Sequence, residues 1–210
     1  CGVRGKVGCW LASFLDPSVR NQAVVVDGHL SDLHPVVSGV PQGTVLGPCL
    51  FLVDLMDIAT NLSADTRATS FADDTRIQHG ISGEQDCEIL QSDLDSIYSW
   101  ADQTGMLFNA GKFELLRFWQ DRDAAPDILY MAPDGGPIEE KDSRRDLGVR
   151  ISTDLSFSDQ VDLTVESGTR MAGWALWTFR GRNRFLMLTI FRSLIQPRLD
   201  YCSQFWSPRD

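Results

Sequence analysis

Two adjacent carboxylates, Asp73 and Asp74, are the side chains of this sequence best suited to chemistry. Residues 66–70 and 75–78 on either side are rich in β-branched side chains, which predicts a strand, a tight turn and a second strand. Such a hairpin holds two carboxylates at a fixed point, and carboxylate oxygens are ligands that hard divalent cations take. The pair is therefore a candidate metal site. An Asp-Asp pair also occurs in ordinary turns, and that alternative stays open here.

The segment 38–43 (SGVPQG) is a second candidate for ligand contact. Two Gly and one Pro in six residues exclude regular structure. Glycine lets a backbone approach a ligand closely, and Gln42 offers both a donor and an acceptor. The alternative is a plain turn before the next element. Neither of the two common glycine-rich phosphate-loop patterns occurs, which argues against a nucleotide-binding module of that kind.

The elements that must position these segments follow from the apolar pattern. Residues 7–15 predict the end of a helix, residues 22–26 a strand, and Asp27-Gly28 a hairpin turn into a second short strand through 34–37. The apolar stretch 44–62 predicts a buried helix, with Thr44 as a cap and Gly47-Pro48 in its first turn.

A long helix is expected after Glu84, ending at Gly105. One stripe of its side chains is apolar: Cys87, Leu90, Leu94, Ile97, Tyr98 and Ala101. Four carboxylates lie mostly off this stripe and indicate a solvated face: Asp86, Asp93, Asp95 and Asp102.

In the second half, the pattern predicts strands at 106–108 and 113–118 around a turn at 109–112. A loop region over 121–145, with at most short edge strands near Ile128 and Ile138, and a strand at 146–151 follow. Helices follow from residue 158, broken at 180–183. This order indicates an α+β fold, an antiparallel sheet with helices on one face, followed by a helical unit. We expect the boundary near residue 155, which divides the chain into 1–155 and 156–210.

Charge is distributed unevenly along the chain. The net charge is −10, which argues against a general binder of polyanions. Residues 168–198, however, contain six Arg and no acidic residue, so this segment carries +6 and the rest carries −16. Five aromatic residues lie in it: Trp174, Trp177, Phe179, Phe185 and Phe191. They could stack on bases, but their helical spacing favours a core role. The basic segment fits phosphate contacts and pairing with the acidic remainder equally well.

The remaining composition restricts the cellular setting. The five cysteines are scattered, form no C-x-x-C pair and do not cluster with histidines, which fits a reducing compartment without a zinc site. We find no signal peptide and no apolar run long enough to span a bilayer, so we expect an intracellular protein, nuclear or cytoplasmic, without a membrane partner. The first residue is Cys, so we expect an internal piece of a longer protein.

Several motifs in order resemble the reverse transcriptase of non-LTR (LINE-type) retrotransposons. They are residues 38–48 (SGVPQGTVLGP), 71–75 (FADDT), 105–109 (GMLFN) with Lys112, 146–149 (DLGV) and 194–208 (LIQPRLDYCSQFWSP). The resemblance covers nearly the whole chain. It implies a right-hand polymerase: residues 1–155 as a partial palm that carries the Asp pair on a hairpin, and 156–210 as a helical thumb and C-terminal extension, without the fingers and the first palm strand.

The resemblance also implies roles for particular residues. Asp73 would be a catalytic metal ligand and Asp74 its partner, and Lys112 would lie near the leaving pyrophosphate as a proton donor. Leu147 and Gly148 would steady the primer end. The nucleotide and template pocket would be lined by Ser38, Gly39, Pro41, Gln42, Gly43 and Phe71. The cofactor would be Mg²⁺, with Mn²⁺ as an alternative, and the substrates an RNA template, a DNA primer and deoxynucleoside triphosphates.

The family's first catalytic Asp lies upstream of the helix that ends at Leu15, so we expect this chain alone to be inactive. The activity of the family is nucleotidyl transfer by an RNA-directed DNA polymerase. The alternative is a catalytically dead or repurposed fragment that binds nucleic acid or a protein. The sequence leaves the oligomeric state and the element's clade open.

Overall fold

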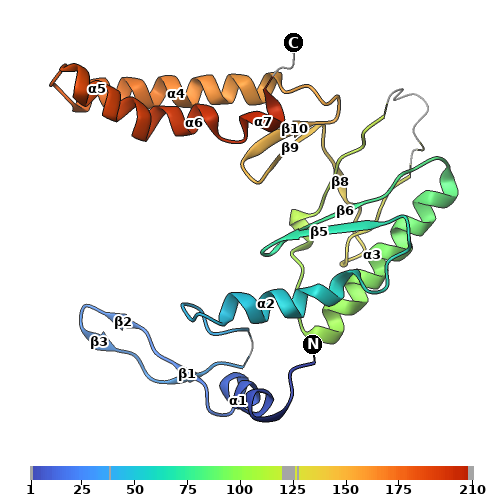
Figure 1. The fold of residues 1–210 in the computed structure, drawn as a ribbon. Helices are drawn as coiled ribbons and strands as arrows, with labels where there is room; N and C mark the ends of the chain where they lie inside the picture. The colour runs from blue at the N-terminus through green and yellow to red at the C-terminus, as the bar shows by residue number, and fades with distance from the viewer. Residues whose placement is uncertain (1, 38, 120–125, 127, 208–210) are drawn as a thin grey trace. The chain divides into compact units, whose positions relative to one another are not determined.

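The computed structural model describes residues 2–37, 39–119, 126 and 128–207. The chain divides into two units, residues 1–107 and 108–210 (Figure 1). The mixture of helices and small sheets agrees with the predicted α+β class. The described strands form five separate two-stranded ladders rather than the expected single sheet, since most of them are only two residues long. The predicted boundary near residue 155 concerns polymerase subdomains and stays a prediction.

The first unit begins with α1 (Gly5–Leu15), which ends before Asp16-Pro17 because a residue that precedes proline disfavours helical dihedrals. Four short strands follow: β1 (Asn21–Gln22), β2 (Val25–Val26), β3 (His29–Leu30) and β4 (His34–Pro35). β1 pairs with β4, and β2 with β3, both antiparallel. Asp27 and Gly28 both have positive φ, 51° and 80°, which confirms the predicted hairpin turn.

The next helix, α2 (Gly47–Leu55), continues into the 3₁₀ turn η1 (Met56–Ala59). The predicted buried helix is shorter and more exposed than expected, with only Gly47, Leu55 and Ile58 buried in these two elements. The reason is that β5 (Arg67–Phe71) and α3 (Glu84–Thr104) pack against η1. Apolar side chains earlier on α2, such as Leu52, therefore remain exposed.

The hairpin of β5 (Arg67–Phe71) and β6 (Asp74–Gln78) is antiparallel and has the predicted position. The long helix α3 (Glu84–Thr104) follows it, with Gly105 at φ 72° closing its C-terminus as expected. Cys87, Leu94, Ile97 and Ala101 are buried, which confirms the apolar stripe.

The second unit begins with the 3₁₀ turn η2 (Ala110–Lys112). β7 (Glu114–Leu115) pairs in parallel with β8 (Glu139–Glu140), and β9 (Ser143–Asp146) pairs antiparallel with β10 (Val149–Ser152). Two expectations were wrong. Residues 106–108 form no strand, and 146–151 is a hairpin rather than one strand, because positive φ at Leu147 and Gly148 reverses the chain.

The C-terminal helices are α4 (Ser158–Thr178), α5 (Arg184–Ile190), the π-helical turn η4 (Phe191–Ile195), α6 (Gln196–Asp200) and α7 (Ser203–Trp206). The break at 180–183 is as predicted. η4 and α6 run back along α4 (Figure 1). A Cβ at Gly168 would lie 2.7 Å from Leu199 Cδ2, so glycine allows this close packing. In the described part of the chain, no helix is both long and apolar enough to cross a membrane.

Candidate catalytic hairpin and its supports

Asp73 and Asp74 lie at the tip of the β5–β6 hairpin. Phe71 pairs with Asp74, so Ala72 and Asp73 form a two-residue turn. Ala72 has φ 53°, a positive value at the first turn residue, which primed hairpin turns require and which glycine adopts more easily than alanine. Directly below the turn, Ser70 Oγ and Thr75 Oγ1 hydrogen-bond across the strands at 2.9 Å. The two carboxylates are therefore held on a short, bridged tip.

The carboxylates of Asp73 and Asp74 are exposed, and neither accepts a hydrogen bond or forms an ion pair with any described residue. Three other aspartates in turns do accept a hydrogen bond from the backbone amide two residues later in the chain. Asp16, Asp134 and Asp154 accept from the amides of Ser18, Gly136 and Ser156 at 2.9, 3.0 and 2.9 Å. This is the usual structural role of Asp in turns. Because the carboxylates of Asp73 and Asp74 do not accept such a hydrogen bond, their oxygens remain available to a cation.

The described residues contain no group of three or more His, Cys, Asp or Glu that could hold a metal ion. The hairpin therefore supplies a pair of carboxylates rather than a complete protein cage. A pair of this kind fits Mg²⁺, which commonly takes one or two protein carboxylates and completes its shell with water and substrate phosphates.

The two faces of the hairpin differ in burial. Ala68, Thr75 and Ile77 are half-buried, whereas Phe71 and Asp74 lie on the exposed face. Side chains alternate between the faces of a strand, so Phe71 and its cross-strand partner Asp74 point to the same side. Phe71 is 66% exposed. The assignment of Phe71 to a nucleotide pocket stays a prediction.

Four polar residues form a network at the open end of the hairpin: Ser63, Thr66, His79 and Asp93. Asp93 Oδ1 accepts from the Ser63 amide at 2.9 Å, and its Oδ2 accepts from the hydroxyls of Ser63 and Thr66. Thr66 Oγ1 lies 2.7 Å from His79 Nδ1. If the single hydroxyl proton of Thr66 goes to Asp93, Nδ1–H of His79 must donate to Thr66. Thr66 precedes β5 and His79 follows β6, so this Asp93 network ties both strands to α3.

Asp93 was predicted on a solvated face, and this was wrong: its exposure is 5%. The side chain of Asp86 is not simply solvated either, because its carboxylate accepts hydrogen bonds from the amides of Ser82 and Gly83 at 2.7 and 3.2 Å. Burial acts to raise the pKa of Asp93, but the hydrogen bonds from Ser63 and Thr66, with a smaller contribution from the charge of His79, outweigh it and lower the pKa. Sequence reasoning missed the Asp93 network because its polar partners lie on separate segments.

The loop 38–43 lies in the same unit as the hairpin, and its first candidate residue, Ser38, lies outside the described residues. Arg20 Nη2 donates to the carbonyl oxygen of Gly39 at 2.9 Å, and Thr44 Oγ1 donates to that of Pro41 at 2.8 Å. Thr44 Oγ1 also accepts from the Gly47 amide at 3.1 Å, but the N-cap of α2 is Leu46, so the predicted cap at Thr44 was wrong.

The loop is therefore fixed at both ends, while Gln42 and Gly43 between them are exposed. Gly43 has φ 75°, a conformation that favours glycine. No hydrogen bond connects this loop with the hairpin in the described part of the chain.

Lys112, Leu147 and Gly148 belong to the second unit. Lys112 is exposed at the end of η2, where Asn109 Oδ1 accepts from the Gly111 amide at 3.1 Å. Leu147 and Gly148 form the β9–β10 turn, with φ 44° and 91°. Tyr201 Oη donates to the Leu147 carbonyl at 2.8 Å, so the end of the helical segment holds this turn.

Gly148→Ala is expected to destabilise the chain by about 1–2 kcal/mol, because alanine is strained at positive φ and its Cβ would lie 3.1 Å from the Tyr201 ring. Urea unfolding measures this effect. The matched control is Gly135→Ala, which has φ 77° but open space around the added Cβ. Equal losses in the two variants would show that the Tyr201 contact does not constrain the turn.

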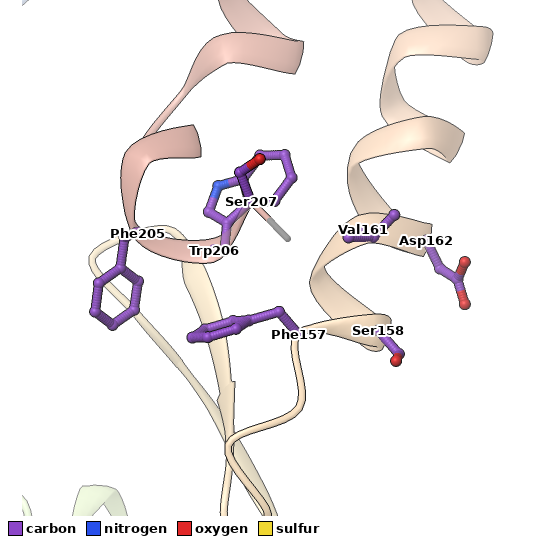
Figure 2. A pocket seen from close by; sticks show the side chains of 7 residues that line it. All are labelled: Phe157, Ser158, Val161, Asp162, Phe205, Trp206 and Ser207. Atoms are coloured by element: carbon purple, nitrogen blue, oxygen red, sulfur yellow. The ribbon is translucent and has the colours of Figure 1, made fainter. Parts of the chain in front are cut away.

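A cavity of about 560 Å³ in the second unit lies between the start of α4 and α7 (Figure 2). Its aromatic lining comes from Phe157, Phe205 and Trp206, and the rings of Phe157 and Phe205 meet edge to face at 5.3 Å. The Asp162 side chain points away from these rings (Figure 2). None of the lining residues is one that the sequence predicted for the site, so we assign this cavity no role in it.

Comparison with known proteins gives consistent results. Residues 1–151 match the family described as reverse transcriptase (RNA-dependent DNA polymerase). The chain is 28% identical to the RNA-directed DNA polymerase from mobile element jockey of Drosophila melanogaster, over 92% of this chain and 22% of that protein. It is also 28% identical to the probable RNA-directed DNA polymerase from transposon X-element of the same organism, over 93% of this chain and 22% of the relative. No solved structure matches the chain significantly.

The chain thus spans about a fifth of the length of these curated relatives. The hairpin with Asp73 and Asp74, the loop before α2, Lys112 and the β9–β10 turn all lie inside the matched segment. Since that segment is well over half of the chain, the chain belongs to the reverse transcriptase (RNA-dependent DNA polymerase) family.

Proposed function

We propose that this chain forms part of the palm and the thumb of a retrotransposon reverse transcriptase that extends a DNA primer on an RNA template. Residues 1–155 belong to the palm in this proposal, and residues 156–210 form the thumb and C-terminal extension. One observation carries it. The carboxylate oxygens of Asp73 and Asp74 have no partner among the described residues, on a hairpin that is bridged below its tip and anchored at its base, inside a segment matched by the family.

The reaction is nucleotidyl transfer: the primer 3′-hydroxyl attacks the α-phosphate of a deoxynucleoside triphosphate, and pyrophosphate leaves. Asp73 and Asp74 would hold Mg²⁺, or Mn²⁺ in its place. The bound metal would supply charge stabilisation for the attacking and leaving oxygens. In this assignment Asp73 is the primary ligand, and Asp74 is its partner on the same tip.

The other residues act on substrates in this proposal. Gln42, Gly43 and Phe71 are exposed and would contact the nucleotide or the template, together with Ser38, Gly39 and Pro41. Lys112 would donate a proton to the leaving pyrophosphate, because a lysine ammonium is a compact donor. Leu147 and Gly148 would support the primer end from a turn held by Tyr201.

A second candidate function is that of a binding module without chemistry. It is favoured by the finding that the described residues contain no metal-binding group of three or more ligating side chains. Two carboxylates from one hairpin need further ligands, which a larger polymerase or bound substrates would have to provide.

Primer extension tests the proposal. The 210-residue chain and a longer polymerase that includes it are each incubated with an RNA template, a DNA primer, deoxynucleoside triphosphates and Mg²⁺. We expect synthesis from the longer protein and none from the 210-residue chain. Synthesis by the short chain would contradict the need for further ligands, and no synthesis from a folded longer protein would favour the binding module.

A further inference from the structure

The last motif of the sequence, residues 194–208, has no role in the proposed function beyond its place in the C-terminal extension. It reaches the β9–β10 turn through one side chain. Tyr201 Oη donates to the Leu147 carbonyl oxygen at 2.8 Å. The Tyr201 ring also lies close to Gly148, since a Cβ on that glycine would be 3.1 Å from a ring carbon. One aromatic side chain therefore contacts both residues of the turn.

The backbone is strained on both sides of this contact. Leu147 has φ 44° and Cys202, the residue after Tyr201, has φ 53°. Positive φ is unfavourable for residues with a Cβ. Such conformations persist only where the surrounding contacts fix them, and they cluster at functional sites. The break at 201–202 separates α6 from α7, and Trp206 Nε1 of α7 donates back to the Tyr201 carbonyl oxygen at 2.8 Å.

The helices behind this contact are themselves packed. Trp206 is buried, with 8% exposure, and α6 packs on α4 where Leu199 meets Gly168. Gln160 of α4 accepts from the Arg150 amide of β10 at 2.8 Å. The helices therefore hold the β9–β10 hairpin both along β10 and at its tip.

The contact between Tyr201 and Leu147 determines position more than stability. The two residues are 53% and 45% exposed. Water can replace the partner in an exposed hydrogen bond, so the net contribution of such a bond to folding is small. A hairpin of two short strands is only marginally stable by itself, and its tip can shift unless other contacts hold it. The Tyr201 hydroxyl group supplies such a contact at the turn itself.

We propose that Tyr201 is a positioning residue for the primer end. Its hydroxyl group fixes the Leu147 carbonyl, its ring leaves little room for a side chain at Gly148, and Trp206 holds Tyr201 in turn. This role rests on the proposed function, in which Leu147 and Gly148 steady the primer, and it adds residues 201–206 to that task. A looser turn would let the primer 3′-hydroxyl leave the geometry of attack, on which the reaction rate depends steeply.

Tyr201→Phe tests this role in a longer polymerase that includes this chain, because the substitution removes the hydroxyl group and keeps the ring. The pre-steady-state burst of single-nucleotide extension is measured with primer–template in excess and Mg²⁺ present. The burst rate constant reports the placement of the primer end, and the burst amplitude reports the amount of active protein. We expect the rate constant to fall about three- to tenfold, the size of one lost hydrogen bond. The amplitude should not change.

Two further variants separate this role from a general disturbance of the segment. Trp206→Phe removes the donor to the Tyr201 carbonyl and keeps a ring in the buried position, so it should also lower the burst rate constant. Gln204→Ala is the matched control, because Gln204 is exposed on α7 and its side chain makes no hydrogen bond with any described residue. Its burst rate constant should equal that of the unaltered protein.

The contact is also checked without catalysis, in the 210-residue chain. Tyr201→Phe should speed hydrogen exchange of the amides beside the β9–β10 turn. Unchanged exchange there, an unchanged burst rate constant, or a loss of amplitude at a constant rate would each overturn the positioning role. Absence of extension by the unaltered longer protein would instead contradict the proposed function, and the primer role with it, so the two failures are distinguishable.

Discussion

Replacing Asp73 with Asn in a longer polymerase that includes this chain is expected to lower the rate of primer extension at least about a hundredfold, which corresponds to about 2.7 kcal/mol in the barrier. Asn keeps the size and turn preference of Asp but removes the negative charge that a metal ligand must supply. The Asp73 oxygens have no partner among the described residues, so folding should not change. Single-turnover extension, with primer–template affinity measured in parallel, separates catalysis from binding.

Asp27→Asn is the matched control for this experiment. Asp27 is an exposed aspartate in the two-residue turn of another hairpin of the same unit, and it also has a positive φ. We expect its substitution to leave extension unchanged. If Asp73→Asn and Asp27→Asn behave alike, the metal assignment is wrong and Asp73 is an ordinary turn residue.

Asp93→Ala is expected to destabilise the protein by about 3 kcal/mol, because it leaves the half-buried polar groups of Ser63 and Thr66 without their charged acceptor. The loss should be concentrated at the β5–β6 hairpin, whose two ends the Asp93 network holds on α3. Urea unfolding measures the total effect. Hydrogen exchange should show faster exchange of the β5–β6 amides, with the β9–β10 hairpin as an internal control.

Asp102 provides the comparison on the same helix, since it is exposed near the end of α3. Asp102→Ala should change stability by no more than about 0.5 kcal/mol. A similar, small effect for Asp93→Ala would mean that the Asp93 network does not anchor the hairpin.

The pH dependence of stability follows from the lowered pKa of Asp93. A carboxyl whose pKa is lower in the folded than in the unfolded state stabilises the fold above its unfolded pKa, about 3.9. This stabilisation is lost as the pH falls through the folded value. Asp93→Asn should therefore remove part of the acid-induced loss of stability, measured by unfolding between neutral pH and about pH 2. An unchanged acid profile would contradict the assignment.

Local sequence alone determined much of the candidate site. The Asp-Asp hairpin, the Asp27-Gly28 turn, the stripe of α3 and the helix break at 180–183 all appear where they were predicted. Each of these features depends on residues close together in the sequence, through turn dihedrals or the helical repeat. The local sequence is therefore enough to predict it. The family motifs were readable for the same reason, because each is short and contiguous.

Tertiary structure decided which polar and aromatic side chains are covered. Asp93 has the sequence pattern of a solvated position, yet Ser63 and Thr66, 30 and 27 residues earlier, bring hydroxyl donors to it and allow a carboxylate to be buried. Trp177 and Phe185 have the spacing of core residues. They lie beside the break between α4 and α5, however, and both side chains are exposed among the described residues. Burial depends on which distant segments meet, and a local pattern does not contain that information.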